Sequence, residues 1–145
     1  MATLTKFYSF VEALAEKKHD LGADTFYVQL TATAPSASTA AIEGDLPADL
    51  STAYGYTAGG VTCGTAVTSA QTSGTYKLCI ADKVITASGG SIGPFRYVTL
   101  FNFSSGSTTN ALLLGYYDYG SSITLADGET FTINFDDANG VLTLA

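Results

Sequence analysis

The chain has 145 residues, 46% of them hydrophobic, and a formal charge of -7 at pH 7. A chain of this length forms one compact domain with one core. The charge resides in residues 21–145, because residues 1–20 hold equal numbers of acidic and basic side chains. Such an acidic body repels phosphate backbones, and its apolar runs are shorter than the roughly 20 residues of a membrane-spanning helix. We therefore expect a single domain over 1–145 that binds neither nucleic acid nor membrane.

Residues 1–22 carry the helical pattern of the chain. Apolar residues recur at steps of three, four and seven between charged ones, and Gly22 stands where a helix commonly ends. The segment predicts an N-terminal arm followed by one amphipathic α-helix, with His19 on its solvated side. It lacks the apolar centre and cleavage site of a signal peptide. The apolar positions of the predicted helix are Phe7, Phe10, Val11, Leu14 and Leu21.

Residues 25–145 are typical of a β-domain. Short runs rich in Thr, Val, Ile, Tyr and Phe alternate with Gly, Asp, Asn and Ser, as in strands joined by tight turns. No helical pattern separates the runs, so we expect a mainly β fold, either an antiparallel β-sandwich or a jelly-roll-like barrel, with one N-terminal amphipathic α-helix. The predicted strands are 25–32, 75–81, 83–87, 94–103, 111–119, 123–126, 129–135 and 141–144.

The last strands have the clearest local pattern. Residues 123–126, the turn Asp127-Gly128 and residues 129–135 predict a β-hairpin. Along 129–135 the residues Phe131, Ile133 and Phe135 should share one face, since side chains alternate along a strand.

Residues 35–61 differ from the rest by their content of Ala, Ser, Thr and Gly. They predict a long loop with short strand pieces. Connections longer than about 12–15 residues are uncommon in compact domains and are often functional or disordered. This loop is the first candidate for a binding segment, and a surface loop without a partner is an equal alternative.

The glycine-rich stretch 88–93 resembles a phosphate-binding loop at first sight. Such a loop needs converging backbone N–H groups at a helix N-terminus, followed by a lysine. Here Pro94, which has no N–H, and a strand follow Gly93. The stretch therefore predicts a turn, and Arg96 behind it predicts a structural ion pair.

The sequence offers little to catalysis, and we expect no enzyme, cofactor or metal. A serine hydrolase triad would need His19, yet no Gly-x-Ser-x-Gly motif is present. Asp136 and Asp137 are adjacent carboxylates in a turn, where they should solvate separately. Cys63 and Cys79 are expected to remain thiols in a cytosolic chain, and the sequon at Asn102 to remain without a glycan.

The aromatic cluster 115–120 invites a binding hypothesis. Tyrosine supplies a flat apolar area and a polar tip at little entropic cost. In a strand Tyr117 and Tyr119 share one face and Tyr116 takes the other, so one side is a candidate contact surface. Core packing of these rings is the alternative.

Several stretches together resemble a family of small virion structural proteins of tailed bacteriophages. The similarity covers most of the chain and is weakest over 36–53. The stretches that carry it are 10–25, 26–30, 55–60, 73–78, 89–102 and 116–145.

This resemblance implies a β-rich capsid decoration or cement protein, made in the bacterial cytoplasm and placed on the capsid exterior. Its partners would be the major capsid protein lattice and its own copies, as a homotrimer, since symmetric lattices favour closed oligomers. The alternative is a tail or fibre-associated virion protein that binds a host-surface glycan. The candidate capsid or subunit contacts are Ala2, Thr3, Leu4, Thr5, Tyr54, Tyr56, Arg96, Tyr116, Tyr117 and Tyr119.

Overall fold

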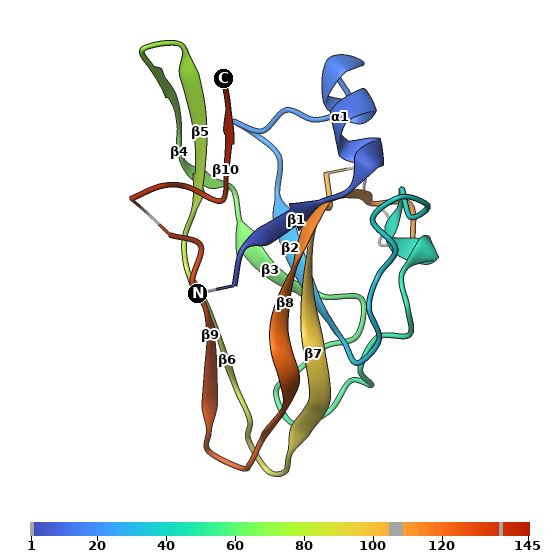
Figure 1. The fold of residues 1–145 in the computed structure, drawn as a ribbon. Helices are drawn as coiled ribbons and strands as arrows, with labels where there is room; N and C mark the ends of the chain where they lie inside the picture. Colours follow the sequence, from blue (N-terminus) through green and yellow to red (C-terminus); the bar gives the residue numbers. More distant parts are fainter. Residues whose placement is uncertain (1, 105–108, 137) are drawn as a thin grey trace.

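The computed structural model describes residues 2–104, 109–136 and 138–145. Over these residues the fold is mainly β, with antiparallel strand pairs and one α-helix near the N-terminus (Figure 1). In chain order the elements are β1 (Leu4–Lys6), α1 (Tyr8–Ala15), β2 (Phe26–Thr31), the 3₁₀-helix η1 (Glu43–Asp45), β3 (Val61–Gly64), β4 (Ala66–Thr72), β5 (Thr75–Ile80), β6 (Lys83–Thr86), β7 (Ile92–Asn102), β8 (Leu112–Leu125), β9 (Thr130–Ile133) and β10 (Leu142–Leu144).

The strands form two layers. One layer is a five-stranded sheet in the order β1-β8-β7-β2-β3. The other consists of a three-stranded sheet, β10-β5-β4, and a two-stranded sheet, β6-β9. These two smaller sheets join at Asp82, whose Oδ1 accepts a hydrogen bond of 2.8 Å from the amide of Phe135. The expectation of a mainly β, sandwich-like fold with one N-terminal helix is confirmed.

The main core fills the space between the layers. Alternate residues of β2, β7 and β8 face it from one side, and residues of β5, β6 and β9 from the other, as strand periodicity requires. Phe131 of β9 meets Phe95 and Tyr119 of the opposite layer, each at a ring-centroid distance of 5.0 Å. A second apolar cluster contains Phe7, Ala40, Phe101, Ala111 and Leu113.

Helix α1 is shorter than the sequence predicts. It ends at Ala15, and Lys17 adopts a left-handed backbone with φ 62°. The amide of Lys18 bonds the carbonyl of Ala13 at 2.9 Å and that of Lys17 bonds Leu14 at 3.2 Å. This pair of bonds is the Schellman arrangement that closes helices, here with a lysine where glycine is usual. No helix of the described residues is long and apolar enough to cross a membrane.

Strand β8 joins two segments that the sequence predicts as separate strands. It runs from Leu112 to Leu125 through Gly120, whose φ of 81° suits glycine. Its last residues pair with the start of β7, Phe95 opposite Ile123 and Ile92 opposite Leu125. The apparent turn around Gly120 is therefore an irregularity inside one long strand.

The predicted hairpin of 123–126 with 129–135 is wrong. β9 pairs with β6, so the turn at Asp127-Gly128 carries the chain from one layer to the other. Ile133 and Phe135 do face the core, with Phe131 partly buried beside them, while the intervening residues are exposed. The alternation of buried and exposed side chains along β9 is the same whether it pairs with 123–126 or with β6. The local pattern therefore does not reveal β6, which lies far away in the sequence, as the partner.

Strands β1, β3 and β4 are absent from the sequence prediction. β4 is exposed at nearly every position, so it lacks the apolar alternation that marks half-buried strands. β1 has three residues and β3 has four, too few for a recognisable pattern.

The long connection 35–61 is held to the body by the buried ring of Tyr56. Its hydroxyl donates to Asp49 Oδ1 at 2.5 Å and accepts from the amide of Leu30 in β2 at 3.0 Å. The second oxygen of Asp49 accepts from the amide of Gly59 at 2.7 Å. Between β2 and β3 the chain contains the 3₁₀-helix η1, and this connection is tethered at its centre.

Tyr56→Phe should lower the free energy of unfolding by about 1–3 kcal/mol, because the amide of Leu30 and Asp49 both lose a buried partner. Chemical denaturation measures this change. Tyr8→Phe is the matched control, since Tyr8 is 69% exposed. Equal stability of the two variants would contradict the anchoring role.

Candidate functional site

The N-terminal segment, expected as a free arm, is part of the five-stranded sheet. Leu4 pairs with Tyr117 and Thr5 with Tyr116, and Ala2 and Leu4 pack against the core. A Cβ at Gly115 would lie 2.8 Å from Leu4 Cγ and 2.9 Å from the carbonyl oxygen of Thr5. Deletion of residues 2–5 would therefore expose the edge of β8, in addition to removing any contact surface that these residues form. Only Thr3 and Thr5 of the predicted arm residues are exposed.

The three tyrosines of β8 are placed by packing. Tyr117 and Tyr119 share one face and Tyr116 takes the other, as expected. Tyr117 is 5% exposed, and burial raises its pKa. Tyr116 is half-buried against Phe7, at a ring-centroid distance of 5.6 Å, and Tyr119 is half-buried against Phe131. Tyr117 is thereby removed from the predicted contact surface, and the other two expose only part of each ring.

The two tyrosines of the long connection have different surroundings. Tyr56 is 2% exposed, so it belongs to the core and not to the predicted contact surface. Tyr54 is 49% exposed, and its ring lies against Gly90, where a side chain would overlap it. Of this pair, Tyr54 alone presents an aromatic face to a partner.

The glycine-rich stretch forms the turn that the sequence predicts. The amide of Gly89 donates to Asp127 Oδ1 at 2.7 Å, and the amide of Ser88 donates to the carbonyl of Tyr54 at 2.9 Å. These donors are already bonded within the chain. A phosphate at this turn would also meet the carboxylate of Asp127.

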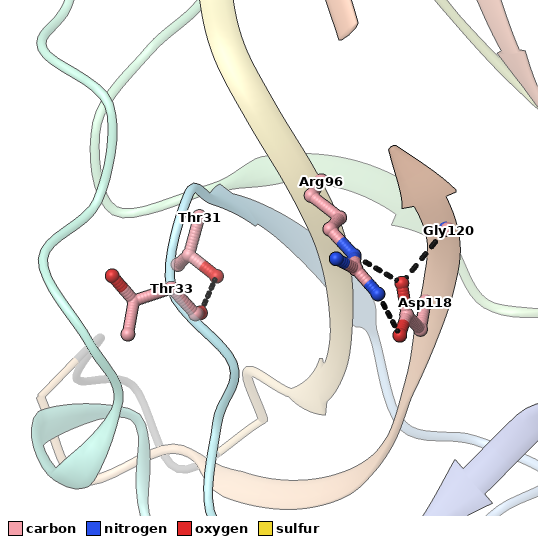
Figure 2. Close-up of polar contacts among 5 residues, drawn as sticks. All are labelled: Thr31, Thr33, Arg96, Asp118 and Gly120. Atoms are coloured by element: carbon pink, nitrogen blue, oxygen red, sulfur yellow. Dashed lines mark hydrogen bonds and ion pairs between the residues drawn. The ribbon is translucent and has the colours of Figure 1, made fainter. Parts of the chain in front are cut away.

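Arg96 forms the expected ion pair, with Asp118 on the neighbouring strand (Figure 2). Its Nε lies 2.7 Å from Oδ1 and its second guanidinium nitrogen lies 2.9 Å from Oδ2. Asp118 also accepts from the amide of Gly120 at 2.8 Å. The Arg96 hydrogen bonds lower the pKa of this carboxyl. The pair links β7 to β8 at the surface and leaves the guanidinium partly exposed.

The expectation that His19 is solvated is wrong, because the side chain is 6% exposed. It lies in the segment after α1, with its ring 5.2 Å from that of Phe10. Asn102 Nδ2 lies 3.1 Å from His19 Nδ1. Since an amide nitrogen only donates, the neutral ring carries its proton on Nε2. Nε2 is buried and has no hydrogen-bond partner among the described residues.

Asn102 connects this histidine to the start of β2. Its amide nitrogen also donates to Asp24, and its Oδ1 accepts from the amide of Ser104 at 2.8 Å. Asn102 is 3% exposed, so the sequon is closed to a glycan in the folded chain. His19 and Asn102 therefore act as internal structure.

Carboxylates of the long connection are the remaining candidates for acid–base chemistry. Burial raises the pKa of Glu43 and of Asp49, and Asp49 raises that of Glu43 further. Both oxygens of Asp49 already accept hydrogen bonds, as described above. Asp137 of the predicted carboxylate pair lies outside the described residues. Within residues 2–104, 109–136 and 138–145, no three His, Cys, Asp or Glu side chains gather as metal ligands would.

Cys63 is half-buried and Cys79 is buried, and their expected thiol state stays a prediction. Burial raises the pKa of the Cys63 thiol to about 12, so its reactive thiolate is scarce at neutral pH.

Sequence reasoning missed an exposed apolar pair on α1. Tyr8 is 69% and Val11 51% exposed, although Val11 was expected on the buried face. Phe10 faces the core as expected, and Ala13 joins it there. The exposed side of so short a helix has no sequence pattern of its own.

Lowering the pH from about 7 to 5 should destabilise the protein through His19. Burial lowers the pKa of His19 below its ordinary value of 6.5, with Asp24 opposing the shift. The unfolded chain thus binds the proton first, and stability is lost as pH falls through 6.5 by at most about 1.4 kcal/mol per unit. Denaturation at several pH values measures the slope, which His19→Gln should reduce over this range. An equal slope in this variant would contradict the assignment.

No known family model, curated protein sequence or solved structure matches this chain. A functional proposal therefore depends on the resemblance noted in the sequence and on the surface, the charge and the side-chain contacts of the described residues.

Proposed function

We propose that this chain is a structural protein of a bacteriophage virion that decorates the assembled head shell through non-covalent contacts. The resemblance of its sequence to small phage virion proteins supports the assignment. Such a protein needs no reacting groups. It needs a stable body that binds the assembled lattice more tightly than free subunits, because this preference shifts the shell toward its closed state by mass action.

The observation that carries the proposal is the apolar pair on α1. Tyr8 and Val11 stand three residues apart on the helix, so their side chains are neighbours on its surface. Large contiguous apolar patches mark protein contacts, and this pair is our candidate for the centre of one. Thr3 and Thr5, the exposed residues of the predicted N-terminal contact, lie in the segment before the helix.

The internal use of the polar groups supports a binding role. Arg96, Asp118 and Asp49 bond to other parts of the same chain, and His19 is buried. The net charge of -7 suits the outside of a particle, since like charges keep decorated shells apart in solution.

The test is the number of copies of this chain per purified particle, measured by quantitative mass spectrometry against the major capsid protein. The proposal predicts a ratio near one to one or a simple fraction of it. A handful of copies would place the chain at the tail or connector, and its absence from particles would refute a virion role.

A charged variant locates the contact within the same assay. Val11→Asp should reduce the copies per particle at least about tenfold, because a carboxylate is costly to bury in an apolar contact. Val84→Asp on β6 is the matched control, since both valines are 51% exposed. An equal loss in the two variants would contradict α1 as the contact face.

A further inference from the structure

Strand β4 is a long and open sheet edge. It spans seven residues, and the order β10-β5-β4 leaves one side of it unpaired. Each residue after Ala66 is exposed, including Val67 at 66%. Figure 1 shows the hairpin of β4 and β5 projecting from the body. The other unpaired outer strands of the described sheets, β1, β3, β6, β9 and β10, have three or four residues each.

Apart from a register shift between Ala66 and Thr68, the edge lacks the usual protection against pairing. Natural edge strands carry lysine, proline or inward charges that prevent another strand from adding to them. Between Asp49 and Lys77 the sequence has no charged residue and no proline. In a chain of net charge -7, β4 is therefore a segment that adds no charge of its own against the approach of a second copy.

The turn after β4 decides which peptide groups are free. Ser73 and Gly74 both have positive φ, 52° and 85°, as a two-residue type I′ hairpin requires. In such a hairpin the flanking residues, Thr72 and Thr75, exchange two backbone hydrogen bonds. Farther from the turn, every second residue pair of β4 and β5 is hydrogen-bonded in the same way. Thr72 and Ala70 thus direct their peptide groups toward β5. Ser69 and Gln71 direct theirs outward, away from the sheet.

We propose that β4 pairs with the β4 strand of a second copy, antiparallel and about a two-fold axis. Full overlap of the seven residues sets Ser69 opposite Ser69 of the second copy and Ala70 opposite Thr68. This register is compatible with the outward peptide groups of Ser69. A second copy is the occupant because the uncharged strand is complementary to itself, whereas repulsion between like-charged bodies disfavours other faces.

An open groove beside the edge supports a seam at this position. It measures about 650 Å³ and lies between the end of α1 and the sheet β10-β5-β4. Ser69, Tyr76, Leu144 and Leu14 lie in its lining, together with the charged residues Lys17 and Asp20 at the α1 side. Leu144 is 36% exposed there. A two-fold axis perpendicular to the sheet would bring two such grooves to one side of the seam.

The pairing is two-fold, unlike the trimer expected from lattice symmetry, and does not depend on the virion assignment.

Sedimentation of the purified chain tests the proposal. Strand-edge interfaces are small and weak, so the concentration series should reach about 1 mM. The expected result is a shift from the 15.0 kDa monomer to the dimer. A monomer at the highest concentration, or a trimer, would overturn the proposal.

Ser69→Pro removes an outward N–H and spares the pairing with β5, because proline is tolerated where the edge faces solvent. It should weaken dimerisation at least about tenfold while circular dichroism remains unchanged. Val84→Lys, on another sheet, is the control and should dimerise as the unaltered chain does. Full dimerisation of Ser69→Pro would contradict pairing through β4.

A charge pair tests the register without relying on proline. Ala70→Lys and Thr68→Glu should each weaken self-association, because like charges become diagonal neighbours across the seam. Mixing the two variants should restore the dimer, since Lys at 70 then faces Glu at 68. A mixture no tighter than either variant alone would exclude this register.

Discussion

The pairing of β7 with β8 is the constraint on which the rest of the structure depends. These strands, 11 and 14 residues long, lie at the centre of the larger sheet, with β2 beside one and β1 beside the other. Their register sets Val98 opposite Tyr117 and Leu100 opposite Gly115, which directs the core-facing side chains of both strands to one side. Gly115 leaves room for Leu4, so the same register also fixes where the N-terminus docks.

Local patterns of the sequence predicted the strands that face the core, because burial on one side imposes alternation. They could not predict pairing partners: residues 123–125 extend β8, and β9 pairs with β6. The burial of His19 also escaped prediction, since it arises from contacts with Asn102 in distant sequence. The tyrosine surface was partly predicted, because Tyr116 and Tyr119 do lie on opposite faces of β8. Which rings are covered depends on Phe7 and Phe131, whose positions follow from the fold.

Polar side chains in this chain mostly serve its own architecture. Asp49 anchors the long connection, Asp118 holds Arg96, and Asp127 closes the glycine-rich turn. Among the surfaces that the described residues leave open are an apolar pair on α1 and an uncharged strand edge. Both suit contacts between proteins, and we propose the first for a head shell and the second for another copy of the chain. The two surfaces lie on different elements.

Amide hydrogen exchange in dilute solution tests the account most directly, because it reports which peptide groups are bonded. The amides that join β7 to β8 should exchange slowest, through global unfolding. On β4 the amides of Ala70 and Thr72 should be protected, while those of Ser69 and Gln71 exchange fast and become protected as concentration rises. Slow exchange of Ser69 and Gln71 in dilute protein, or fast exchange at the centre of β8, would contradict it.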